Sequence, residues 1–165
     1  MTRFAALAFA LLSLPALAQT TLAQTTLAQT TLAQTAAPVR ADQPWARATA
    51  PQQEIGAAYV TLTSPAGDRL VGASSPLAGR AEVHSMRMDG TVMQMREVGD
   101  GLPLPAGQPV VLAPGGYHIM LVNLTRPLRA GESIPVQLRF QNAPPLDLQF
   151  QVGPPGARGP AAHTH

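Results

Sequence analysis

Residues 83–95 read VHSMRMDGTVMQM, and this stretch contains one histidine and four of the six methionines of the chain. Asp89-Gly90 is typical of a two-residue hairpin loop, because a type I′ turn needs a positive φ at both loop positions. With these two residues as the loop, we expect Met86 to lie opposite Met93 and His84 to lie opposite Met95. The stretch therefore predicts a β-hairpin.

Alternation along the two strands of this hairpin sends every second side chain to the same face. The residues of one face are His84, Met86, Met88, Met93 and Met95. The other face carries Ser85, Arg87, Gln94 and Arg96, which is typical of a surface in contact with solvent. We expect no acidic residue on the methionine face.

From Val39 onward, short alternating or β-branched segments are separated by Pro and Gly turns. The predicted strands are residues 56–63, 69–74, 81–88, 91–98, 108–112, 117–124, 134–141 and 146–152. No long segment has a helical period. Seven or eight short strands at this spacing indicate an all-β sandwich or barrel. Trp45 and Tyr59 are expected to pack in its core or at its edge.

The two ends of the chain differ from this pattern. Residues 1–18 predict a cleavable secretory signal peptide, with a positive start at Arg3, an apolar run and an Ala16-Leu17-Ala18 cleavage site. Residues 19–38 repeat the pentapeptide LAQTT and predict a disordered linker. The folded domain is expected over 39–152, followed by a disordered tail over 153–165. The apolar run is too short for a membrane span, so we expect a mature chain without one, located in the periplasm.

Composition excludes several classes of function. The eleven basic residues are all arginine, they face nine acidic residues, and they are scattered singly, so no nucleic-acid partner is expected. The chain contains no cysteine, which excludes thiolate metal sites such as blue copper. No sequence motif for a nucleophile or a general acid–base pair occurs, so we expect a protein that is not an enzyme.

A second fragment, Tyr117-His118-Ile119-Met120, repeats the chemistry of the hairpin. His118 and Met120 are two residues apart on a predicted strand and therefore share a face. If this strand is a neighbour of the hairpin, the two fragments offer two imidazoles and two thioethers, from His84, Met95, His118 and Met120. Thioethers are soft ligands that favour Cu(I). The competing interpretation is a structural β-sandwich in which methionine only fills the core.

The text around both fragments, EVHSMRMDGTVMQMREV and LAPGGYHIMLVNL, resembles the PCuAC family of periplasmic copper chaperones over roughly residues 39–152. The resemblance implies a cupredoxin-like Greek-key β-sandwich or barrel of about seven to eight strands. It also implies one Cu(I) bound through His84, Met95, His118 and Met120, with Met86 as an auxiliary ligand. Met88 and Met93 are assigned to the apolar surround of the site.

The tail histidines, His163 and His165, resemble the histidine-bearing C-terminal extensions of some family members. There the resemblance implies a second site, for Cu(II), and an inert terminus is the alternative.

The resemblance further implies delivery of copper toward the CuA site of cytochrome c oxidase. The implied partners are oxidase subunit II, a Sco-type thiol protein, or both, and a monomer is expected. Periplasmic copper storage or resistance is the alternative, because it would use the same residues. An electron-transfer cupredoxin is disfavoured by the absence of cysteine.

Overall fold

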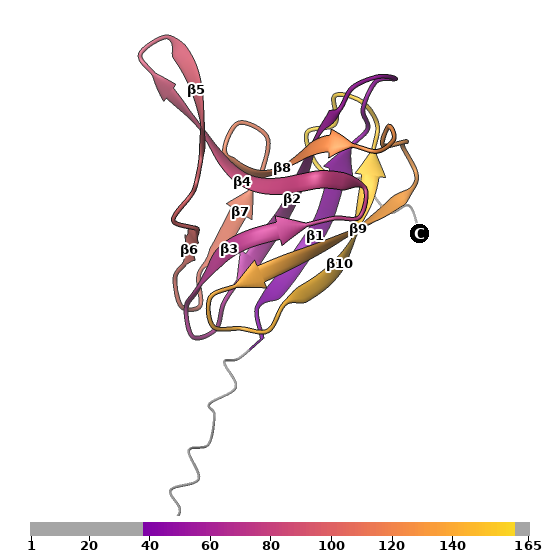
Figure 1. The fold of residues 1–165 in the computed structure, drawn as a ribbon. Coiled ribbons are helices and arrows are strands. Elements are labelled where there is room, and N and C mark those ends of the chain that lie inside the picture. The colour runs from indigo at the N-terminus through magenta and orange to yellow at the C-terminus, as the bar shows by residue number, and fades with distance from the viewer. Residues whose placement is uncertain (1–37, 161–165) are drawn as a thin grey trace, which may run out of the picture. The chain divides into compact units, whose positions relative to one another are not determined.

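The computed structural model describes residues 38–160, which form ten β-strands and no helix (Figure 1). The strands are β1 (Arg40–Arg47), β2 (Ile55–Thr63), β3 (Asp68–Ser74), β4 (Ala78–Asp89), β5 (Val92–Glu97), β6 (Leu102–Leu104), β7 (Pro109–Leu112), β8 (Tyr117–Leu124), β9 (Ser133–Phe140) and β10 (Leu146–Gly153). The all-β prediction is confirmed. The predicted signal peptide, the repeat linker up to residue 37 and both tail histidines lie outside the described residues.

The strands form one sheet in the order β5-β4-β8-β7-β2-β1-β10-β9-β3-β6, and a pairing of β4 with β3 closes eight of them into a barrel. Strands β5 and β6 stay outside this closed ring, at the two ends of the order. The barrel is mixed, because β1 runs parallel to β10 and β7 runs parallel to β8, whereas the other pairs are antiparallel. This is the cupredoxin-like architecture that the resemblance implied. The described part of the chain has no helix with the length and apolar character that a membrane span requires.

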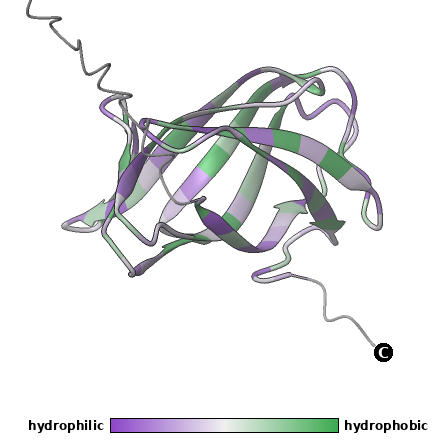
Figure 2. Ribbon diagram, turned by 90° about the horizontal axis from the view of Figure 1, so that it is seen from below, coloured by the Kyte–Doolittle hydropathy of each residue, from purple (hydrophilic) through white to green (hydrophobic). Residues whose placement is uncertain are grey.

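Hydrophobic and hydrophilic residues alternate along the barrel strands (Figure 2). On β8, Ile119 and Leu121 turn inward and are fully buried in the core. Their neighbours His118 and Met120 therefore turn to the outer face of the barrel wall. The inward side chains of β2, β9 and β10 complete the core, among them Val60, Leu62, Ile134, Leu138 and Phe150.

All eight predicted strands are present, with ends within three residues of those predicted. Strands β1 and β6 were not predicted. In β1 the pairing with β2 shifts register between Asp42 and Trp45, where Gln43 has a φ of 51° and is followed by Pro44. Such a bulge breaks the alternation on which strand prediction depends. Strand β6 has only three residues, and one of them is Pro103.

The hairpin of β4 and β5 projects from the barrel (Figure 1), and its register differs from the prediction. Met86 pairs with Met95, and His84 pairs with Glu97, so the expected pairing of His84 with Met95 is wrong. The loop is Gly90-Thr91, with a positive φ of 61° at Gly90 and none at Thr91, as in a type II′ turn. The register moves by two residues, and therefore each side chain keeps its predicted face.

Candidate metal centre

Strands β4 and β8 are antiparallel neighbours, which is the condition on which the predicted metal site depends. His84 lies directly across from His118, and Glu82 lies across from Met120. The two imidazole rings have their centroids 5.9 Å apart, at an interplanar angle of 49°. The histidines of the two fragments, 34 residues apart in the chain, are thus in contact range on the outer face of one sheet.

Three of the four predicted ligands line one pocket of about 160 Å³, namely Met95, His118 and Met120. The other walls come from residues 47–49 at the end of β1 and from residues 53 and 55–57 at the start of β2. His84 is not part of the lining, but its side chain is only 12% exposed and its ring lies beside that of His118. Met86, the predicted auxiliary ligand, is paired with Met95.

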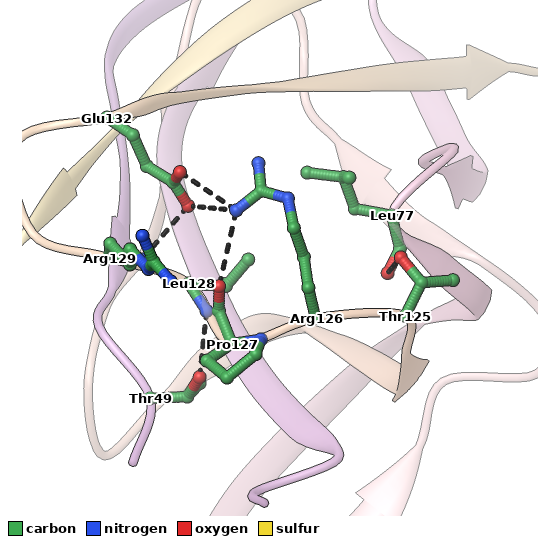
Figure 3. A network of polar contacts seen from close by, with 8 residues as sticks. All are labelled: Thr49, Leu77, Thr125, Arg126, Pro127, Leu128, Arg129 and Glu132. Atoms are coloured by element: carbon green, nitrogen blue, oxygen red, sulfur yellow. Dashed lines mark hydrogen bonds and ion pairs between the residues drawn. The ribbon is translucent and has the colours of Figure 1, made fainter. Parts of the chain in front are cut away.

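A polar network fixes the part of the pocket wall that contains Thr49 (Figure 3). Thr49 donates its backbone N–H to the carbonyl of Leu128 at 3.0 Å, and Leu128 donates its N–H to Thr49 Oγ1 at 2.9 Å. The loop that carries Leu128 is braced by an ion pair of 2.8 Å between Arg126 and Glu132. Because both hydrogen bonds join loops far apart in sequence, they hold the pocket wall in a defined place.

His118 is 4% exposed and lines the pocket. Its Nδ1 lies 3.2 Å from the carbonyl oxygen of Gly116, which also accepts the N–H of Met86 at 3.1 Å. A carbonyl can only accept, so Nδ1 carries the hydrogen and Nε2 keeps its lone pair. Burial lowers the pKa of His118. The hydrogen bond to Gly116 raises this pKa, and the nearby His84 lowers it further. The imidazole is therefore neutral at neutral pH, which is the form that binds a metal.

His84 has an acidic neighbour that was not predicted from the sequence. Glu82 Oε2 lies 3.0 Å from His84 Nε2, and Arg80 Nε lies 2.8 Å from Glu82 Oε1. His84 Nδ1 is buried and has no hydrogen-bond partner. The expectation of no acid on the methionine face is wrong, because Glu82 is two residues before His84 and Glu97 is directly across from it. Alternation alone would have placed Glu82 on this face.

Trp45 and Tyr59 pack against each other with ring centroids 4.4 Å apart and 4% exposure each, in agreement with the predicted packing in the core or at its edge. The Tyr59 ring lies 6.5 Å from that of His118. Arg47 stacks over Tyr59 at 5.8 Å and donates two hydrogen bonds, of 2.7 and 3.2 Å, to the carbonyl of Ala157. The structure thus describes the first part of the tail predicted to be disordered: Gly153 ends β10, and Ala157 is tied to the pocket wall.

The tip of the hairpin is apolar and exposed. Met88 is 61% exposed, Met93 is 53% exposed and Val92 is 60% exposed. Neither Met88 nor Met93 lines the pocket formed by Met95, His118 and Met120, so their assignment to the surround of the site stays a prediction. Met95 is also 48% exposed, but it differs from the tip residues because it lines the pocket with His118 and Met120.

The family model "Putative lipoprotein LpqE-like" matches residues 39–152, which is the whole barrel up to β10. The chain belongs to this LpqE-like family. The solution structure of CuI-DR1885 from Deinococcus radiodurans is 32% identical to this LpqE-like protein, covers 74% of this chain and 83% of that chain, and has a TM-score of 0.56. The copper-bound PCuAC domain from PmoF2 is 23% identical, covers 73% of this chain and 96% of that chain, and has a TM-score of 0.60, which shows the shared fold.

A putative lipoprotein, Lxx21020, from Leifsonia xyli subsp. xyli is 35% identical over 104 residues. The match spans 63% of this LpqE-like protein and 63% of that relative. Together with the PCuAC domains among the similar structures, the family match confirms the resemblance to PCuAC proteins.

The donor atoms of the LpqE-like site fit a soft cation. Within residues 38–160, no three histidine, aspartate or glutamate side chains gather closely enough to hold a metal ion. A site at this place therefore depends on its thioethers together with its imidazoles. Such a donor set favours Cu(I) over zinc, which prefers thiolate, imidazole and carboxylate, and over calcium, which requires oxygen.

Proposed function

We propose that this LpqE-like protein carries Cu(I) as its cargo, bound by His84, Met95, His118 and Met120 with Met86 as an auxiliary ligand. The observation that supports this most is that Met95, His118 and Met120 line one pocket while the His84 ring lies across from His118. Similar proteins of known structure are described as CuI-DR1885 and as a copper-bound PCuAC domain, which agrees with this proposal.

The chemistry of the four ligands suits binding followed by transfer. Neutral imidazoles and thioethers leave the bound ion with its single positive charge, which a partly apolar surface tolerates better than a dication. Thioethers need no deprotonation and form no disulfides, so the site works in an oxidising compartment. A thioether is also a weaker donor than a thiolate, which favours release to a partner.

The test of the cargo is an anaerobic competition titration of Cu(I) against a chromophoric chelator. Met95→Leu removes the sulfur and keeps the side-chain volume. Met93→Leu is its matched control, because both residues lie on the same face of β5 with exposures of 48 and 53%. We expect one tightly bound Cu(I) in the parent, an affinity at least about tenfold lower in Met95→Leu, and no change in Met93→Leu. Equal affinities of the two variants would exclude Met95 as a ligand.

We further propose that the protein works in the periplasm and delivers copper toward the CuA site of cytochrome c oxidase. The proposed recipient is oxidase subunit II, a Sco-type thiol protein, or both. The predicted signal peptide over residues 1–18 and the description of a relative as a putative lipoprotein support a location in the cell envelope. Copper storage or resistance is the alternative use of the same site.

A measurement of copper transfer distinguishes delivery from storage. The copper-loaded protein is mixed with the soluble CuA domain of subunit II, with and without a Sco-type protein, and the copper content of each protein is measured after separation. Delivery predicts that copper moves to the recipient. Retention of all copper by the donor under both conditions would favour storage.

A second copper site is proposed at His163 and His165. Imidazole suits Cu(II), and the described part of the tail approaches the pocket, because Ala157 accepts hydrogen bonds from the pocket residue Arg47. A chain cut after Pro160 keeps the Ala157 contact and loses both histidines. We expect its Cu(I) binding to be unchanged and its Cu(II) stoichiometry to be lower. Equal Cu(II) stoichiometry would show that the terminus is inert.

A further inference from the structure

We propose that Glu82 is a positioning residue for the copper site. It holds His84 as the tautomer with the hydrogen on Nε2, so that His84 presents Nδ1 to the metal, whereas His118 presents Nε2. The proposal rests on the proposed function, because it assigns donor atoms within that site. It assigns a role to a residue that is not one of the four ligands. It also distinguishes His84 from His118, which the sequence motif treats alike.

The contact between Glu82 and His84 fixes the position of one hydrogen. Oxygen Oε2 of Glu82 lies 3.0 Å from Nε2 of His84. The carboxylate can only accept, so the imidazole donates its Nε2–H. Arg80 Nε lies 2.8 Å from the other carboxylate oxygen and so orients the group toward His84. The side chains of Glu82 and His84 are only 22 and 12% exposed, so water screens this contact less than it would a surface pair.

The second nitrogen of His84 is left with a lone pair and no partner. Nδ1 is buried and makes no hydrogen bond. An unpaired buried polar atom is destabilising and rare in native structures. The opposite tautomer would be worse, because it would bury an unpaired N–H at Nδ1 and set two acceptors against each other at Glu82. A soft cation bound at Nδ1 would give this atom its missing partner.

His118 shows the reverse arrangement on the neighbouring strand. Its Nδ1–H donates to Gly116 O at 3.2 Å, which leaves Nε2 as the donor atom for a metal. The two rings lie across from each other with centroids 5.9 Å apart, so each ring is held by its own partner, a carboxylate for His84 and a carbonyl for His118. Such partners orient a ligating imidazole and raise its basicity.

The first test uses the metal-free full chain. Nitrogen NMR of the imidazole rings reports which nitrogen of each histidine carries the hydrogen, and we expect Nε2–H for His84 and Nδ1–H for His118. Silver(I), a soft monovalent ion, is then added in place of Cu(I), because nitrogen–silver coupling identifies the bound atom. We expect coupling at His84 Nδ1 and at His118 Nε2. Hydrogen on Nδ1 of His84, or silver coupling at its Nε2, would overturn the proposal.

Variants of Glu82 test whether this residue sets the tautomer. Glu82→Leu removes the acceptor at similar volume, and Glu82→Gln keeps one acceptor oxygen without the charge. Glu97→Leu is the matched control, because Glu97 is directly across from His84 but exposed. We expect Glu82→Leu to mix the two tautomers of His84 and to weaken Cu(I) binding about 10- to 100-fold.

We expect Glu82→Gln to recover part of the single tautomer of His84 and part of the Cu(I) affinity. We expect Glu97→Leu to match the parent in both. An unchanged tautomer and affinity in Glu82→Leu would overturn the role of Glu82. A parent that binds neither Cu(I) nor silver(I) would instead overturn the proposed function and the donor assignment together. The two failures are distinguishable, because the tautomer is measured without metal.

Discussion

Replacing His118 by asparagine should separate the two roles of this side chain. The asparagine amide can donate to Gly116 O in place of Nδ1, but it has no counterpart of Nε2. We therefore expect the variant to fold and to lose at least about tenfold in Cu(I) affinity, which corresponds to about 1.4 kcal/mol. His118→Ala should lose the same metal donor and, in addition, the hydrogen bond.

The size of the stability change follows from the surroundings of His118. Gly116 O also accepts the N–H of Met86 at 3.1 Å, so removal of the imidazole leaves this carbonyl paired. The lost hydrogen bond in His118→Ala then costs only its net contribution, about 0.5–1.5 kcal/mol. Asparagine is smaller than histidine, and the gap at a position that is 4% exposed adds about 1 kcal/mol. We expect losses of about 1 kcal/mol for His118→Asn and about 2–3 kcal/mol for His118→Ala.

The two quantities are measured separately. Urea unfolding of the metal-free proteins can follow Trp45, the single tryptophan, which is buried against Tyr59. The same preparations then enter the Cu(I) competition titration. Parental Cu(I) affinity in His118→Asn would refute the ligand role of Nε2. A stability loss above about 4 kcal/mol would show instead that His118 acts as a core residue whose replacement disrupts packing.

Three further changes test the structure around the site. Burial raises the pKa of Asp68, but four hydrogen bonds from N–H groups outweigh this effect and lower the pKa below 3.8. The ionised carboxylate therefore stabilises the folded state above that pH, and this stabilisation is lost as the pH falls through the native pKa. The difference in melting temperature between the parent and Asp68→Asn should therefore be largest at neutral pH and should shrink in acid; a difference that grows in acid would contradict this. Thr49→Val removes the acceptor of the Leu128 N–H and should lower the free energy of unfolding in urea by about 1–2 kcal/mol, whereas an unchanged value would show that this network does not hold the pocket wall. Gly101→Ala should destabilise more than Gly107→Ala, because both have positive φ, of 80° and 69°, but only the added Cβ at Gly101 would meet a backbone oxygen, at 2.8 Å; equal melting temperatures of the two variants would refute this.

Much of the barrel can be predicted from alternation alone. The strand predicted over 117–124 coincides with β8 because Ile119 and Leu121 are apolar and buried, as alternation requires, and the segment has no internal Pro or Gly. The faces of the hairpin could also be predicted, since side-chain alternation survives a register shift of two. The turn type could not, because Asp-Gly and Gly-Thr loops are both compatible with the same sequence and the strand pairing decides between them.

The candidate residues could be named from the sequence, but their assembly in space could not be predicted from it. Nothing local in the sequence pairs β4 with β8, because their contact depends on closure of the barrel by strands far apart in the chain. Glu82 could have been found, since it lies two residues before His84 on the same strand. The pocket walls at Arg47 and Thr49 could not, because β1 is irregular and its end is held by a loop nearly eighty residues later.

Strand β5 lies at the end of the sheet, so the strand that carries Met95 needs less free energy to open than the strand that carries His118 and Met120. Strand β8 is paired on both sides and alternates its ligands with core residues, so its hydrogen bonds open only when the barrel unfolds. Strand β5 is paired only with β4 and can fray while the barrel stays closed. For a bound copper ion, this predicts an ordered exchange in which Met95 leaves first and an incoming ligand takes its place, while His118 and Met120 hold the ion until the transfer is complete.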